Sequence, residues 1–407
     1  MKNISTKTIN LVKEAENKLD FSYIEEIALF NQDKVLSKFR EHKLSYRHFA
    51  GTTGYGYGDE GKENLNRIFA GICGAEDAFI SPYIASGTHA LALMIRGILN
   101  HGDTIVSISG APYETVTTLL TKDYPTSLSN SVAYKQIDLI EGKAFDYEAI
   151  SIAAQSANVI YITRSRGYLD RDALSIACIA EVIRFIRDIN KNVIIAVDNC
   201  YGEFVSKCEP IEVGADLIAG SLIKNAGGGI APSGGYIAGK HNLVERISYM
   251  MTAPGVGREI GSYSNGYKEF YQGLFMAPTT VLNAVKGCML FSQVYGDLGL
   301  KTFPKQGQIC KDIICSIEFG AKEPLIDFCR SIQEISPIDS YVHLEPWAMP
   351  GYDNDIIMAA GTFNAGSSIE LSADSPIREP YIAYVQGALT YEHAKLAVLY
   401  SLERYLH

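Results

Sequence analysis

The sequence predicts an α/β fold in which helices cover both faces of a mainly parallel β-sheet, followed by a smaller α+β domain. The chain has 407 residues, enough for two or three domains with a substantial core. Hydrophobic residues make up 47% of it and charged residues 20%, the balance of a well-packed soluble enzyme. Short apolar runs alternate with helical runs through the middle of the chain, which is typical of a parallel sheet.

The first fifty residues are predicted to form a helical arm. From about Thr6 to Lys43, apolar side chains recur at spacings of three and four, the period of an amphipathic helix. The segment GTTGYGYGDEG at residues 51–61 follows. Its glycines allow a tight, irregular path that a regular helix or strand would not take, so a close approach of the chain to another group is expected there.

A large α/β domain is predicted over residues 51–300. Its expected strands are the apolar runs TIVSIS (104–109), VAYKQID (132–138), VIYIT (159–163), VIIAVD (193–198) and LIAGSLI (217–223), with a helix over residues 174–189. After about residue 300 the elements become shorter, and residues 301–407 are predicted to form a small α+β domain ending in a helix over residues 390–405. The Pro- and Gly-rich stretch 346–366 is interpreted as a loop and strand of that domain.

Charge and composition disfavour several classes of protein. A formal charge of −10 without any polybasic run argues against nucleic-acid binding. The longest uncharged stretch, residues 78–95, is interrupted by polar residues and a proline, so we expect neither a membrane span nor, from the N-terminal residues, a signal peptide. The eight cysteines contain no CxxC pair, and neither they nor the eight histidines form a metal-ligand motif. We therefore expect a cytoplasmic protein with reduced thiols and no metal.

Two residues at the ends of expected strands suggest a specific chemistry. Asp198 ends one apolar run, and Lys224 follows the next run 26 residues later. In an open parallel sheet ligands bind beyond the carboxyl ends of the strands, so both side chains can reach one crevice. Pyridoxal phosphate (PLP) needs a lysine for its Schiff base and an acid beside its pyridine nitrogen. Alone, each residue is more simply explained as a helix cap or a solvated lysine.

A phosphate site is predicted nearby. Ser86, Gly87 and Thr88 open an apolar helix directly after a short apolar run, and a helix N-terminus binds phosphate through its free N–H groups. Ser221 offers a further hydroxyl three residues before the lysine. Tyr113, just beyond another expected strand, can supply an aromatic face for a planar ring. In isolation the hydroxyls are equally well explained as helix caps, and the tyrosine as core packing.

Taken in order, these segments resemble a known family. SGTHA (86–90), PYETV (112–116), VDNCYGEF (197–204) and SLIKNAGGG (221–229) resemble the signature of the Cys/Met-metabolism family of fold-type I PLP enzymes, which includes cystathionine lyases and methionine gamma-lyases. GYGYGDEG (54–61), YITRSRGY (161–168) and IELSADSPIREPY (369–381) resemble its aluminium-resistance subfamily more closely. The resemblance covers nearly the whole chain and implies a fold-type I seven-stranded sheet domain with a small C-terminal domain.

The resemblance also implies roles for individual residues. Lys224 would carry the Schiff base and move protons, Asp198 would face the pyridine nitrogen, and Tyr113 would stack on the ring. The phosphate would be held by the hydroxyl and backbone groups of Ser86, Gly87, Thr88 and Ser221. Tyr55 or Tyr57 would reach the phosphate of a neighbouring subunit, which requires a homodimer with shared sites and suggests a tetramer. Arg378 would bind the substrate α-carboxylate, a task suited to the bidentate guanidinium.

The chain departs from the wider family at three places. Asp59 and Glu60 follow the paired tyrosines where cystathionine lyases usually carry an arginine, and Ile223 replaces a threonine before the lysine. Arg164 and Arg166 stand in the loop at the edge of the expected cofactor site. These arginines are candidates for neutralising the cofactor's phenolate oxygen or binding a second substrate carboxylate.

The predicted function is PLP-dependent cleavage of a carbon–sulfur bond in a sulfur amino acid, by β- or γ-elimination. Another PLP enzyme, such as an aminotransferase, would use the same residues. A nucleotide-binding protein is a second alternative, because residues 56–62 match GxxxxGK, although Glu63 replaces the Ser or Thr that binds magnesium in a P-loop. A third is a non-catalytic stress-response protein. The motif SLIK at residues 221–224 also fits SxxK, but the SDN and KTG motifs of β-lactamases are missing from the sequence.

Overall fold

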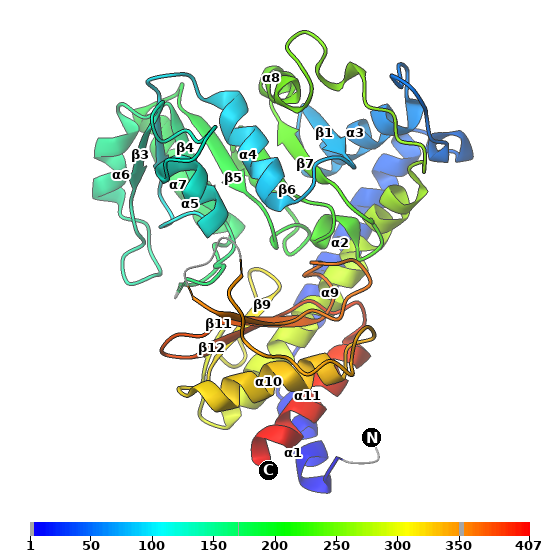
Figure 1. Ribbon diagram of the computed structural model, residues 1–407, viewed down its shortest axis with the longest axis vertical. Helices are drawn as coiled ribbons and strands as arrows, with labels where there is room; N and C mark the ends of the chain where they lie inside the picture. The colour runs from blue at the N-terminus through cyan, green and yellow to red at the C-terminus, as the bar shows by residue number, and fades with distance from the viewer. Residues whose placement is uncertain (1–3, 170, 350–353) are drawn as a thin grey trace.

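The larger part of the fold is built on a seven-stranded sheet (Figure 1). The computed structural model describes residues 4–169, 171–349 and 354–407. The sheet has the order β1-β7-β6-β5-β4-β2-β3, with strands β1 (Asp77–Ser81), β2 (Thr104–Ser107), β3 (Ala133–Gln136), β4 (Val159–Thr163), β5 (Ile194–Asp198), β6 (Leu217–Ser221) and β7 (Gly235–Gly239). Strands β3, β2, β4, β5 and β6 pair in parallel, and β7 runs antiparallel to both of its neighbours. The predicted mainly parallel sheet is therefore confirmed.

The central strands are apolar throughout because both of their faces are covered. Along β4, Ile160 and Ile162 belong to one hydrophobic core, whereas Val159 and Tyr161 belong to the other. This is the two-residue period of a strand buried on both sides. One core is covered by α3 (Glu60–Cys73), α6 (Tyr147–Ala154) and α7 (Ile176–Ile189), and the other by α4 (Gly87–Ile98), α5 (Glu114–Thr121) and α8 (His241–Met251).

The small domain contains a five-stranded antiparallel sheet that lies below the large sheet in Figure 1. Its order is β10-β11-β12-β9-β8, with strands β8 (Lys301–Phe303), β9 (Ile314–Glu318), β10 (Ile356–Ala359), β11 (Ser372–Pro376) and β12 (Ile382–Gln386). Helices α10 (Lys322–Glu334) and α11 (Tyr391–Leu406) complete it. The predicted loop and strand at 346–366 contains β10, and its residues 350–353 lie outside the described residues.

The predicted N-terminal helical stretch is broken into two helices. These are α1 (Thr6–Glu16) and α2 (Ser22–Glu41), and the break has a local cause. The Asp20 carboxylate accepts a hydrogen bond from the Ser22 backbone N–H at 2.9 Å, an Asx turn that replaces helical hydrogen bonding between the two helices. Helix α1 packs against α11 at the far end of the chain, where the Tyr391 hydroxyl donates to Glu16 at 2.7 Å.

Helix α9 (Lys268–Asp297) connects the two domains. Within the described residues it is the one helix long and apolar enough to cross a membrane, and 67% of that apolar window is buried inside the protein. It packs on α2 and on the turn after β6 in the large domain, and on β9 and α11 in the small domain. At the turn the two backbones touch, because a Cβ on Gly228 would lie 2.3 Å from the Gly273 carbonyl oxygen. Burial in the core accounts for the apolar composition of α9.

Candidate active site

A cavity of about 460 Å³ lies where the carboxyl ends of the central strands meet the small-domain sheet. Strand β5 ends at Asp198, and the neighbouring parallel strand β6 ends three residues before Lys224. Both side chains line the cavity. The other predicted residues that line it are Ser86, Gly87, Thr88, Tyr113, Arg166, Ser221 and Arg378. The structure therefore brings together most of the predicted site.

The Lys224 amine is surrounded by groups that favour its charge. Its Nζ lies 3.9 Å from the centre of the Tyr201 ring. Burial works against the ammonium ion, but the neighbouring acidic side chains of Cys200, Tyr201 and Asp198 outweigh burial, so the pKa of Lys224 is raised. Without a ligand, the amine is therefore held as an ammonium ion.

Asp198 is held at the end of β5 with only 5% of its surface exposed. Burial raises the pKa of its carboxyl group, whereas the Lys224 charge and the Cys200 backbone N–H, which donates to Oδ1 at 3.1 Å, lower it. A carboxylate in such a position stabilises a positive charge placed opposite it.

The start of α4 forms a cradle of hydroxyl and backbone N–H groups. Ser86 caps the helix by accepting a hydrogen bond from the His89 backbone N–H at 3.0 Å. The Thr88 hydroxyl lies 2.8 Å from the Thr115 hydroxyl. Twelve residues of aligned peptide dipoles follow, so the cradle favours an anion.

Gly87 lets this helix approach the lysine closely. A Cβ on Gly87 would lie 3.3 Å from Cys200 Sγ, 3.5 Å from Ser221 Cβ and 3.9 Å from Lys224 Nζ. A larger side chain would fill the space between the α4 N-terminus and the amine. The predicted glycine therefore has a steric reason.

Tyr113 and Tyr168 line one side of the cavity. Tyr113 stands directly before α5, and its ring centre lies 6.2 Å from that of Tyr168. Tyr168 in turn lies 5.0 Å from Tyr384 of β12. This chain of aromatic rings joins the two domains beside the predicted ring-stacking residue.

The prediction for Arg164 is corrected by the structure. Its side chain is fully buried and does not line the cavity. Instead, its Nη1 donates to Asn199 at 2.8 Å and forms an ion pair with Glu209 at 3.3 Å. The Arg164 backbone N–H donates to the Asp198 carbonyl and extends the β4–β5 ladder by one residue. Because side chains alternate along a strand, Arg164 points to the face opposite Thr163, away from the cavity. Arg164 is a structural residue beneath the site.

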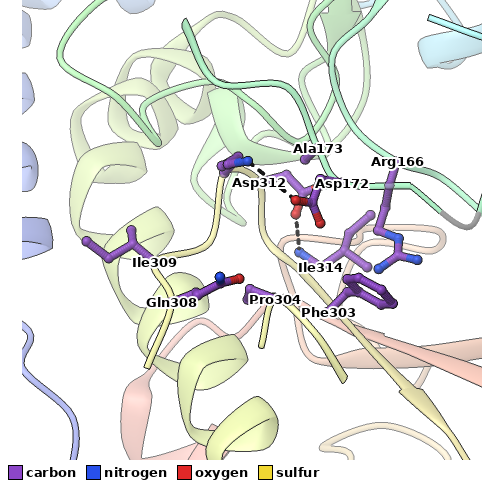
Figure 2. A pocket seen from close by; sticks show the side chains of 10 residues that line it. Arg166, Asp172, Ala173, Phe303, Pro304, Gln308, Ile309, Asp312 and Ile314 are labelled. Carbon is purple, nitrogen blue, oxygen red and sulfur yellow. Dashed lines mark hydrogen bonds and ion pairs between the residues drawn. The ribbon is translucent and has the colours of Figure 1, made fainter. Parts of the chain in front are cut away.

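Arg166, two residues further, does reach the cavity. It is 3% exposed, donates to the Ser316 hydroxyl at 2.7 Å and stacks on Phe303 with its guanidinium carbon 5.1 Å from the ring centre. Figure 2 shows Arg166 and Phe303 at a second, small cavity of about 30 Å³, which Asp312 also lines. Much of the guanidinium is therefore used to join the two domains.

The remaining predicted residues lie at the surface. Arg378 follows β11, is exposed and lines the mouth of the cavity. Tyr55 and Tyr57 are each 69% exposed and lie outside the cavity of their own chain, with ring centres 5.6 Å apart. Their predicted contact with a neighbouring subunit stays a prediction.

The glycine segment does not provide the nucleotide site that was considered as an alternative. Residues 51–59, all of them described, contain no strand, and α3 begins at Glu60. The Lys62 amine donates to the carbonyl oxygens of Arg258 at 2.9 Å and Ile260 at 3.3 Å. A lysine tied to carbonyl groups in this way is not available to bind phosphate.

Sequence reasoning missed several polar residues around the site, among them Thr163, Glu203 and Asp374. Thr163, at the end of β4, lines the cavity, and its buried hydroxyl has no hydrogen-bond partner among the described residues. The rule that identified Asp198 as the end of an apolar run would also have found it. Glu203 is buried near the turn after β6 that carries Lys224, here called the lysine turn. Its backbone carbonyl accepts a hydrogen bond from the Asn225 side chain at 3.0 Å. Asp374 lines the cavity from the small domain.

Comparison with known proteins agrees with this geometry. A family model described as methionine gamma-lyase matches residues 8–406. The chain belongs to the methionine gamma-lyase family. A relative from Bacillus subtilis, the uncharacterized protein YnbB, is 47% identical over 380 residues. The match covers 92% of this chain and 90% of the relative.

Solved structures support the same assignment to the methionine gamma-lyase family. A carbon-sulfur lyase involved in aluminum resistance from Clostridium novyi NT is 44% identical, with a TM-score of 0.94, covering 99% of this chain and 96% of that one. A protein from Clostridium acetobutylicum, described as a candidate cystathionine beta-lyase involved in aluminum resistance, is 46% identical with a TM-score of 0.96, at the same coverage. The PLP-dependent protein YhfS from Escherichia coli is 13% identical with a TM-score of 0.63 over 93% of this chain and 96% of that one, which shows a shared fold. The predicted family and fold class are confirmed.

Proposed function

We propose that the protein is a PLP-dependent carbon–sulfur lyase that acts on a sulfur-containing amino acid by β- or γ-elimination. One observation carries the proposal: Lys224 and Asp198 enter a single cavity from the ends of adjacent parallel strands, beside the N-terminus of α4. Membership of an enzyme family named for methionine gamma-lyase supports it.

The residues present fit PLP. Lys224 offers the amine, Asp198 the acid for the pyridine nitrogen, and the start of α4 the phosphate cradle, with Gly87 leaving the space between them. When bound, PLP supplies an electron sink for the negative charge that forms at the α-carbon of an amino acid.

The side chains of this chain would then position the substrate and move protons. Arg378 would hold the α-carboxylate through two parallel N–H donors at the mouth of the cavity. The Lys224 Nζ, in its neutral form, would accept the α-proton. Tyr113 would give its hydroxyl proton to the departing sulfur, which leaves as a thiol.

The same residues would also serve an aminotransferase, which remains the alternative within PLP chemistry. The two activities differ in their products. A lyase releases a thiol, ammonia and a keto acid without a second substrate, whereas an aminotransferase needs a keto-acid acceptor and releases no thiol. Incubation with methionine, cystathionine or cysteine, with and without an added keto acid, distinguishes them.

We further propose an assembly of at least two subunits in the cytoplasm. Tyr55 and Tyr57 are exposed and lie outside their own cavity, as expected of side chains that complete the phosphate site of a neighbour. A dimer, and by family resemblance a tetramer, would place them there. Sedimentation of the wild type, together with cofactor affinity in a Tyr55→Ala, Tyr57→Ala double variant, tests this arrangement.

The central experiment is covalent trapping of the cofactor. The purified protein, incubated with PLP and reduced with borohydride, should carry the cofactor on the peptide that contains Lys224. Lys224→Ala should abolish the adduct, whereas Lys240→Ala, a change of an exposed lysine in the same domain, should leave it intact. A protein that stays colourless after incubation with PLP would contradict the proposal.

A further inference from the structure

One wall of the cavity carries a carboxyl group that the proposed chemistry does not use. Asp374 lies in the middle of β11, opposite Met358 of β10 and Tyr384 of β12 in the antiparallel register. It lines the cavity together with Ser372 and Gln386, which come from the same sheet. Only 8% of Asp374 is exposed. An acidic side chain is thus buried in the wall formed by the small domain.

This carboxyl group receives fewer hydrogen bonds than its two oxygens can accept. Among the described residues, its Oδ2 accepts one long bond from Gln386 Nε2 at 3.4 Å, and its Oδ1 has no partner. The Tyr168 hydroxyl also interacts with the carboxyl group. Burial raises the pKa of Asp374 to about 7, while Tyr168, Gln386 and Lys224 act in the opposite direction. Leaving a buried acceptor unpaired costs free energy, so a ligand that donates a hydrogen bond here gains affinity.

Most other charged groups of the cavity already have another role, and the remaining acid, Glu114, lines it from α5 of the large domain. Lys224 and Asp198 lie at the end where the cofactor fits, and the exposed Arg378 guanidinium suits a carboxylate. The Arg166 guanidinium is bonded to Ser316 and to the Leu169 carbonyl. Asp374 is the acid that lines the cavity from the small domain. Its carboxyl group suits a positively charged donor on the substrate side chain.

We infer that Asp374 is a specificity-determining residue that recognises an amino group on the substrate side chain, beyond the sulfur atom. The inference rests on the proposed function and names the substrate class of the same site. A side chain that ends in a methyl group after the sulfur has no donor and would leave the acid unpaired. An ammonium group donates three hydrogen bonds and supplies the opposite charge. The cavity should therefore discriminate against a plain methyl thioether such as methionine.

Binding can be tested with amino acids that contain no sulfur and cannot be cleaved. L-lysine and L-2-aminoheptanoate have side chains of equal length that end in an ammonium and a methyl group, respectively. Their dissociation constants are measured from the change in the visible absorbance of the PLP-loaded enzyme. Wild type should bind lysine about tenfold to a hundredfold more tightly, the range for a hydrogen bond to a charged group. Asp374→Asn should remove most of this preference.

Turnover provides the matching test. S-(2-aminoethyl)-L-cysteine and S-propyl-L-cysteine differ only in the terminal amino and methyl groups, so their ratio of kcat/KM isolates the recognition of the amine. Asp374→Asn should lower that ratio mainly through KM for the amino-bearing substrate. Asp374→Ser, which removes the acid without adding volume, serves if the asparagine variant is unstable. Asp327→Asn, an acid of α10 with a half-exposed side chain, controls for the change in net charge.

The outcomes separate this inference from the proposed function. If the loaded enzyme shows its cofactor absorbance but wild type prefers neither ligand, or Asp374→Asn keeps the wild-type preference, the role of Asp374 is wrong. If no cofactor absorbance forms in the wild type, the proposed function itself is wrong. A loss of preference in Asp374→Asn, with cofactor absorbance and Tm unchanged, supports the inference.

Discussion

The amine of Lys224 lies over the face of the Tyr201 ring, 3.9 Å from its centre. At this distance the ring stabilises the ammonium form, because the face of an aromatic ring carries partial negative charge. The contact holds the amine in the cavity before any ligand arrives. It also gives the first test of how the chain controls the charge of this lysine.

We predict that Tyr201→Leu lowers the pKa of Lys224, by about one unit for a partly desolvated cation–π contact. The measurement is the pH dependence of the reaction of Lys224 with an acylating reagent in the cofactor-free protein, followed by peptide mass spectrometry. Tyr201→Phe keeps the ring face but loses the hydroxyl, which also favours the ammonium form, so we expect a smaller fall in the pKa than in Tyr201→Leu. Equal shifts in the two variants would show that the hydroxyl, rather than the ring face, is responsible.

A second prediction concerns Asp198. Asp198→Asn keeps the shape of the side chain but removes the negative charge that would face the cofactor ring, so kcat should fall by more than about a hundredfold, an effect of about 3 kcal/mol at the transition state. Cofactor content, measured after denaturation, should remain near one per chain if the phosphate cradle carries most of the binding. A variant with near wild-type kcat would exclude Asp198 from its proposed role.

Arg378 is predicted to act on binding of the α-carboxylate. Arg378→Ala should raise KM about tenfold to a hundredfold, as expected when a charge-assisted bidentate pair is lost, while the cofactor absorbance stays unchanged. Arg378→Lys keeps the charge but loses the fork of donors, and we expect intermediate values. Steady-state kinetics on one amino-acid substrate decides the matter, and an unchanged KM in the alanine variant would rule out this contact.

The buried acid Glu203 predicts a pH dependence of stability. Burial raises the pKa of Glu203 from 4.5 to about 8, although Tyr236 donates a hydrogen bond to it at 2.7 Å. Between those two values the folded chain keeps a proton that the unfolded chain releases, so the free energy of unfolding falls as pH rises through this range. Asp374, with its pKa raised to about 7, contributes with the same sign.

Glu203→Gln should therefore flatten the decline in stability without abolishing it. The variant retains an oxygen that accepts from Tyr236 but has no proton to lose. Urea unfolding gives the free energy of unfolding of wild type and variant at about pH 5 and about pH 9. The effect of Glu203 is the loss of stability between the two pH values in the wild type minus the same loss in the variant. A decline of the same size in both proteins would show that Glu203 is not the responsible group.

The buried Arg164–Glu209 pair predicts a large loss of stability that is independent of the cofactor. Glu209→Ala would leave the fully buried Arg164 guanidinium without its counter-charge, which typically costs about 3–5 kcal/mol. Glu63→Ala removes an exposed pair with Arg67 and should cost less than about 1 kcal/mol. Denaturant unfolding measures both. Similar values for the two variants would contradict a structural role for the buried pair.

The sequence predicted the central strands well because burial on both faces leaves an unbroken apolar run. The expected strand at 159–163 coincides with β4, and the expected strand at 217–223 runs two residues past the end of β6 at Ser221. The small-domain strands were not predicted one by one. In β11, for instance, the residues are Ser, Ala, Asp, Ser and Pro, which become buried only when neighbouring strands and helices pack around them.

The candidate site was predictable where it follows the strand-end rule and unpredictable where it depends on orientation or domain packing. Asp198 and Lys224 follow from their positions after apolar runs. Arg164 and Arg166 are two residues apart and have similar neighbours in the sequence. Only Arg164 continues the hydrogen-bond ladder of β4, which directs its side chain beneath the sheet. Asp374 enters the cavity from the other domain, so no local pattern in the sequence places it near Lys224.

The contact between α9 and the lysine turn has a consequence for how the protein responds to heat. The Thr280 hydroxyl donates to the Gly228 carbonyl at 3.2 Å, and the same helix packs on β9 and α11 of the small domain. Because α9 packs on both domains, unfolding of either domain would remove its support. The loop that carries Lys224 would then also lose its packing against α9. Scanning calorimetry should accordingly show a single endotherm for the whole chain, and activity should vanish over the same interval of temperature.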